Sequence, residues 1–105
     1  MSRKAGKASP LFEQGRFRIM AYLAGPASKA VTFNDVKRDL EFTQGNLSVQ
    51  LQKLKQLGYI RITKDFHDNK PRTTVNVTDK GVLHLKLHLE EMQSILKSLN
   101  KGVKA

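Results

Sequence analysis

With 105 residues, the chain has room for one domain, and the absence of cysteine excludes disulfides and thiolate metal sites. No apolar run approaches the roughly 20 residues of a membrane span, and the N-terminus lacks the hydrophobic segment of a signal peptide. We therefore expect a soluble, cytoplasmic protein. Nineteen Lys and Arg against nine Asp and Glu give a net charge of +10, which favours a polyanionic partner, most commonly nucleic acid.

The charge is unevenly distributed along the chain. From Phe42 to Lys64 there is no acidic residue. Four cations fall in this stretch: Lys53, Lys55, Arg61 and Lys64. A generally basic surface without a nucleic-acid partner is the alternative interpretation, but the concentration of charge in one segment favours nucleic acid.

The N-terminal third predicts a tail and two helices. Residues 1–8 (MSRKAGKA) are polar and unpatterned, which is typical of a flexible tail. A helix is predicted from the cap Ser9-Pro10 to Gly25-Pro26, and Thr32, with Asp35 three residues on, begins a short second helix. The tail carries three cations that we expect to add sequence-independent affinity for DNA: Arg3, Lys4 and Lys7.

A third helix is predicted over about residues 43–57, with Thr43 as its cap. Gly58 follows where a helix end needs a left-handed residue. The helix has a single apolar stripe, which predicts one buried side: Leu47, Leu51, Leu54 and Leu57.

The hydrophobic period then changes from that of a helix to that of a strand. Ile60 and Ile62 alternate with polar residues, as do Val75 and Val77. A polar loop, residues 65–71, separates the two patterns. The segment of about 59–78 is therefore predicted to be a β-hairpin.

From Asp79 almost to Asn100 the pattern is helical again, with apolar residues at alternating steps of three and four. Such a heptad seam is typical of helices that pair. One part of it could pack on the first helix and another on a second copy of the chain; folding back entirely on its own domain is the alternative. We expect dimerisation through residues Leu11, Val82, Leu85, Leu89, Met92, Leu96 and Leu99.

The order of elements predicts a mainly α fold with a small antiparallel β-hairpin, that is, a winged helix-turn-helix with a long C-terminal helix. Four segments resemble MarR-like and ArsR-like transcriptional regulators of the short, single-domain type: residues 43–48 (TQGNLS), 58–60 (GYI), 70–73 (KPRT) and 77–81 (VTDKG). The resemblance implies a prokaryotic, nucleoid-associated regulator that binds a near-palindromic operator as a homodimer. We expect a flexible basic tail (1–8), a winged helix-turn-helix DNA-binding domain (9–78), and a C-terminal dimerisation helix with a tail (79–105).

If the leucine stripe of the third helix is buried, its opposite side is rich in amides. Gln and Asn pair with adenine, an exposed valine can touch a thymine methyl group, and helix N-termini suit phosphates. We expect the recognition helix to contact DNA through Thr43, Gln44, Gly45, Asn46, Ser48, Val49, Gln52 and Lys53.

The hairpin would form the wing. Lys70 and Arg72 are its candidate DNA contacts, since Asp65 and Asp68 disfavour close phosphate approach along the whole tip. For Arg72, an ion pair that fixes the hairpin is an alternative role.

Other functions are less well supported. No nucleophile–base pair, glycine-rich phosphate loop or carboxylate dyad suggests an enzyme, and we expect no cofactor. His84 and His88 stand four apart, but such a pair is more often ordinary helix surface than a metal site. A non-specific architectural or RNA-binding role and a protein-interaction module remain as alternatives, and the sequence leaves any small-molecule effector open.

Overall fold

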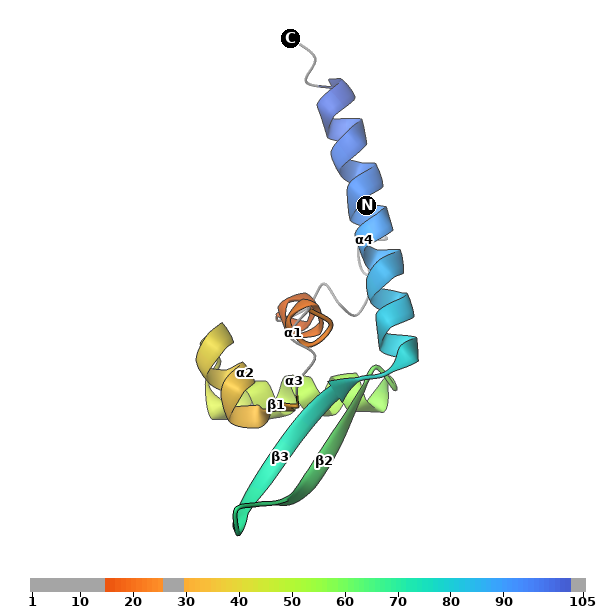
Figure 1. Cartoon of the computed structure of the whole chain (residues 1–105). Coiled ribbons are helices and arrows are strands. Elements are labelled where there is room, and N and C mark those ends of the chain that lie inside the picture. Colours follow the sequence, from red (N-terminus) through yellow and green to blue (C-terminus); the bar gives the residue numbers. More distant parts are fainter. Residues whose placement is uncertain (1–14, 26–29, 103–105) are drawn as a thin grey trace.

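A computed structural model describes residues 15–25 and 30–102. Figure 1 shows helix α4 rising away from a body of three shorter helices, while the hairpin of β2 and β3 projects in the opposite direction. This arrangement confirms the predicted α+β winged helix-turn-helix with a long C-terminal helix. In chain order, the elements are α1 (Arg16–Leu23), β1 (Val31–Thr32), α2 (Phe33–Leu40), α3 (Gln44–Gln56), β2 (Ile60–His67), β3 (Lys70–Val77) and α4 (Asp79–Gly102).

The sheet has one strand more than the predicted hairpin. Strand β1 pairs antiparallel with β3, with Val31 opposite Val75 and Thr32 opposite Thr74, so the order is β1-β3-β2. A strand of two residues contains no alternation that a sequence pattern could reveal. Its pairing anchors the start of α2 to the root of the wing.

The predicted polar loop over residues 65–71 is wrong, because most of it is strand. The β2–β3 ladder continues to His67 opposite Lys70. Only Asp68 and Asn69 form the turn, with φ of 55° and 64°, as a two-residue hairpin turn of two left-handed residues requires. All side chains from Thr63 to Lys70 are exposed, so no buried face imposes the apolar alternation that marks a strand.

Helix α1 begins at Arg16, later than predicted. Gly15 precedes it with φ 80°, a left-handed conformation that does not belong to a right-handed helix. A Cβ there would lie 2.9 Å from the Phe42 ring, so this glycine also permits close contact with the α2–α3 link. The predicted cap Ser9-Pro10 lies outside the described residues.

The core forms where α1, α2 and α3 meet the sheet and the base of α4. Three of the four leucines of the α3 stripe are buried, and Leu57 is partly buried against them. Gln50, on the same helix, is also fully buried; helical spacing puts it on the leucine side, although its amide by itself does not predict burial. Arg16 Nε donates to Gln50 Oε1 at 2.8 Å, and this hydrogen bond joins α1 to the inner side of α3.

Two expectations for the base of α4 need correction. Leu85, predicted as a dimer contact, is only 6% exposed and belongs to the core of its own domain. His88 is buried rather than on open helix surface, with its ring 5.1 Å from that of Phe17 on α1. The heptad spacing identified residues that share a face, but the first turns of that face pack against α1 of the same chain.

Helix α2 starts with the predicted capping box, which makes its stability dependent on pH. Asp35 N–H donates to Thr32 Oγ1, and Thr32 N–H donates to Asp35 Oδ2, both at 3.0 Å. The hydrogen bond from the Thr32 backbone, followed by those from the Thr32 hydroxyl and Arg38, holds the pKa of Asp35 below its usual 3.8. A lowered pKa contributes stability that is present above the unfolded-state value and is lost as pH falls through the folded-state value.

We therefore expect Asp35→Asn to lower the free energy of unfolding at pH 7 and to have a smaller effect at pH 3. Urea unfolding of both proteins at the two pH values measures the difference. Thr32→Ala is the matched control, because it removes the other half of the box and should cost about 1 kcal/mol. An equal effect of Asp35→Asn at pH 7 and pH 3 would contradict the role of its charge.

Candidate nucleic-acid interface

Helix α3 presents its amide side to solvent because its leucines fix the opposite side in the core. Thr43 caps the helix, its Oγ1 accepting from Asn46 N–H at 3.2 Å. Gly45 and Gln52 are exposed, and Val49 between them is 54% exposed. The structure thus places these residues on the side predicted to face DNA, and their contact with DNA stays a prediction.

Two amides of α3 are already engaged within the protein. Asn46 Oδ1 accepts from Gln50 Nε2 at 3.3 Å, and Gln44 Oε1 lies 3.5 Å from Lys37 Nζ on α2. The hydrogen bond from Gln50 holds the Asn46 side chain in one orientation. Such fixed side chains lose less rotamer entropy when they bind a base edge or a phosphate.

A groove of about 300 Å³ separates the first half of α3 from the wing. Three of the predicted contacts lie along its α3 side, namely Gln44, Ser48 and Gln52. Lys64 of β2 and Thr73 of β3 form part of the opposite side. The sequence reveals the charge of Lys64 but assigns neither residue to the interface, because only the hairpin register shows that both face α3.

The two residues of the wing that were predicted to contact DNA, Lys70 and Arg72, have different surroundings in the structure. Lys70 is exposed next to the turn. Arg72 lies opposite Asp65 in the ladder and donates to both of its carboxylate oxygens, from Nε at 3.2 Å and from Nη2 at 3.3 Å. The alternative role of Arg72 in fixing the hairpin is therefore present in the structure, and a DNA contact by Arg72 remains a prediction.

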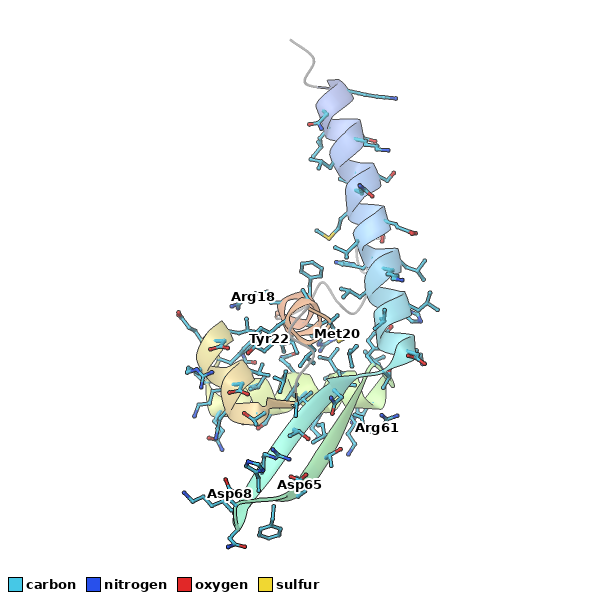
Figure 2. The ribbon with its side chains drawn as sticks, viewed as in Figure 1. Arg18, Met20, Tyr22, Arg61, Asp65 and Asp68 are labelled. Carbon is cyan, nitrogen blue, oxygen red and sulfur yellow. The ribbon has the colours of Figure 1, made fainter. Side chains whose placement is uncertain are left out.

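Cations outnumber acids on this surface, and one of the two acids of the outer wing is held in an ion pair with an arginine. Asp65 pairs with Arg72, and Asp68 lies 3.5 Å from His67. Figure 2 shows Asp65 and Asp68 towards the wing tip and Arg61 near its root. Four cations of the acid-free segment are exposed on α3 and β2: Lys53, Lys55, Arg61 and Lys64.

The outer part of α4 carries the predicted dimer seam. Every residue from Leu89 to Gly102 is exposed, and an apolar groove of about 680 Å³ runs along this part of the helix. Val82 is partly buried at the helix base, and Leu11 lies outside the described residues. Four predicted dimer residues line the groove: Leu89, Met92, Leu96 and Leu99.

A family model described as a winged helix DNA-binding domain matches residues 16–96. The chain belongs to this family. The matched region contains the whole of α3 and the wing, which are the elements that build the interface described above.

Three other proteins are similar to this chain in sequence or in structure. The uncharacterized protein MJ0432 of Methanocaldococcus jannaschii is 30% identical over 84 residues, which are 80% of this chain and 89% of that protein. The structure of a transcriptional regulator homologue from Pyrococcus horikoshii has a TM-score of 0.82 at 28% identity, covering 92% of this chain and 94% of the other. MepR of S. aureus, solved with DNA, shares the fold with a TM-score of 0.67 at 19% identity, covering 84% of this chain and 64% of its own.

Within the described part of this winged helix domain, no cluster of three or more His, Cys, Asp or Glu is placed to hold a metal ion. His84 stacks on Tyr59, with ring centroids 4.9 Å apart, and His88 packs on Phe17. The two histidines thus fasten α4 to the domain. None of the described helices is long and apolar enough to cross a membrane.

Proposed function

We propose that this DNA-binding regulator is sequence-specific and binds a near-palindromic operator as a homodimer. The observation that carries the proposal is the exposed side of α3, where Val49 stands beside the amides Asn46 and Gln52 and a single cation, Lys53, follows one turn later. A helix that only neutralised phosphates would gain affinity from cations there, whereas amides and a valine suit the hydrogen-bonding pattern of adenine and the methyl group of thymine.

The surrounding residues supply the sequence-independent part of the affinity. In the proposed complex, Thr43, Gln44 and Ser48 at the start of α3 contact phosphates, and Lys53 and Lys70 neutralise them from the end of α3 and from the wing. Bound in this way, the protein would act on chromosomal DNA in the cytoplasm.

The homodimer is supported by the exposed apolar groove of α4. A single recognition helix reads few base pairs, so helix-turn-helix proteins gain affinity by binding two half-sites about 34–36 Å apart with a two-fold dimer. Beyond His88, the exposed apolar residues of α4 form one continuous patch, whereas exposed apolar residues that have no partner usually stand singly. A second copy of the same helix offers a matching heptad surface.

Selection from a random pool of duplex DNA at near-physiological salt tests the proposal. We expect enrichment of a two-fold motif whose half-sites lie about one helical turn apart. Binding without any motif would instead support an architectural role, and no retained DNA would overturn the proposal.

Replacing Gln52 by alanine should relax the preference at one base pair of each half-site, at a cost of about 1–3 kcal/mol against the selected operator. Competition between the operator and single-base variants measures this change. Asn100→Ala, which removes an exposed amide near the end of α4, is the matched control and should preserve the preference. A specificity profile identical to that of the unmodified protein would exclude Gln52 from base reading.

A further inference from the structure

The tip of the wing carries an exposed apolar pair. Phe66 is 73% exposed, the highest value among the large hydrophobic residues that the structure describes as exposed. Its partner across the ladder is Pro71, which is also exposed. Single apolar side chains are common on protein surfaces, but here two of them stand directly opposite each other beside the turn that ends the wing.

The hairpin register places this pair on the side of the wing that faces α3. Side chains of successive strand residues alternate between faces, and directly opposite residues share a face. Phe66 and Pro71 therefore share a face with Lys64 and Thr73, the next pair towards the root. Since Lys64 and Thr73 line the groove against α3, the apolar pair continues the same surface beyond that groove.

An ion pair on the opposite face of the wing stiffens the hairpin that carries the Phe66 ring. Asp65 and Arg72 form a two-bond ion pair there, between the Phe66–Pro71 and Lys64–Thr73 pairs of the ladder. The turn beyond is limited to two residues. The hairpin can thus present an aromatic ring at a fixed place without the entropy loss of ordering a long loop.

The charges around the ring match a nucleic-acid surface better than an apolar protein surface. Lys64, two residues before Phe66 on the same strand, shares its face, and Lys70 is exposed on the other face beside the turn. Proteins that bind the minor groove commonly combine basic or amide side chains with an inserted apolar side chain, and Lys64 with Phe66 offers such a combination on one face of the wing.

We propose that Phe66, supported by Pro71, is an apolar contact to the DNA minor groove beside the major groove that α3 enters, and that Lys64 and Thr73 hold the phosphate backbone between the two. This inference rests on the proposed function and adds to it a source of affinity that does not depend on salt. The burial of an aromatic ring on deoxyribose releases no counterions, whereas each neutralised phosphate does.

The test compares the full-length protein with Phe66→Ala and Lys64→Ala on the duplex enriched by selection, or on a mixed-sequence duplex if none is enriched. Phe66→Ala should weaken binding about tenfold or more and leave the slope of log affinity against log salt unchanged. Lys64→Ala should reduce that slope by about 0.9 for each phosphate that the lysine neutralises. Phe66→Leu keeps an apolar side chain and should retain most of the affinity.

Footprinting on the enriched duplex locates the contact. With Phe66→Ala, we expect protection from hydroxyl radicals, which attack deoxyribose in the minor groove, to disappear at one flank of each half-site. Protection of guanine N7 in the major groove should persist, because α3 is unaltered. Thermal unfolding verifies that the variants remain folded.

The outcomes separate this inference from the proposed function. If the unmodified protein binds DNA and Phe66→Ala binds equally well with the same footprint, or if the substitution changes the salt slope as Lys64→Ala does, the wing-tip contact is wrong and the regulator proposal stands. If the unmodified protein retains no duplex DNA, both are wrong, and the exposed ring serves a protein partner or contact between copies.

Discussion

Replacing Gly81 by alanine is expected to destabilise the domain by about 1–3 kcal/mol or more. Gly81 lies in the first turn of α4, where a Cβ would overlap the Tyr59 carbonyl oxygen and stand 3.0 Å from Met20 Cε. The side chain of Met20 can move, but the Tyr59 carbonyl cannot, because it accepts from Thr78 N–H at 3.0 Å. The helix would have to shift away from the end of α3, and the free energy of unfolding measured in urea should fall accordingly.

Gly81→Ala should also disturb the proposed DNA-binding surface, because Gly81 lies at the junction of α4 with the end of α3 and the wing. Thr78 Oγ1 donates to the Gly58 carbonyl at 2.6 Å and accepts from Gly81 N–H at 3.0 Å. These bonds tie the first turn of α4 to the end of α3 and the root of the wing, so they fix the orientation of α4 relative to α3.

Gly45→Ala is the matched control for stability. Gly45 lies within α3, and nothing stands within 4 Å of a Cβ placed there, so alanine should stabilise the helix by up to about 1 kcal/mol. If this variant is as unstable as Gly81→Ala, steric conflict at Gly81 is not the cause. Gly45 is also a proposed DNA contact. Because Gly45→Ala should remain folded, any loss of DNA affinity in this variant would not be due to unfolding.

Sequence patterns predict the elements of this fold wherever one side of an element is buried. The leucine spacing of α3 anticipates its buried and exposed sides, the Thr43 cap anticipates its start, and Gly58 has the expected left-handed φ of 80°. The outer wing lacks a buried side, so its pattern predicts a loop where the structure has strands. Strand β1 and the buried Arg16–Gln50 hydrogen bond arise only from tertiary contacts, which no local pattern encodes.

For the candidate site, the sequence identifies residue types better than their partners. It places the amides of α3 on one face, but the hairpin register is needed to bring Lys64 and Thr73 to the same groove. Arg72 is open to two interpretations because its distance from Asp65 depends on that register. Leu85 shows the same limit, since heptad spacing defines a face and does not say which surface covers it.

Replacing Leu96 by glutamate is expected to convert the protein from a dimer to a monomer and to lower its affinity for the operator at least about 100-fold, because a dimer binds its second half-site at high effective concentration. Leu96 is 56% exposed and lines the apolar groove of α4. A glutamate in a dimer seam would bury an unpaired charge, which strongly disfavours association. Molar mass in solution, measured by sedimentation across a range of concentrations, gives the oligomeric state directly.

Leu87→Glu provides the control, because it introduces the same charge on the same helix away from the groove. Leu87 is 50% exposed, and at about 100° per residue it lies on the side of α4 opposite Leu96. This variant should remain a dimer and bind the operator normally. Since both leucines are exposed, neither substitution should reduce the helix content measured by circular dichroism. A dimer that survives Leu96→Glu would show that the groove of α4 is not its interface, whereas equal dissociation by both variants would indicate that α4 pairs through more than one face.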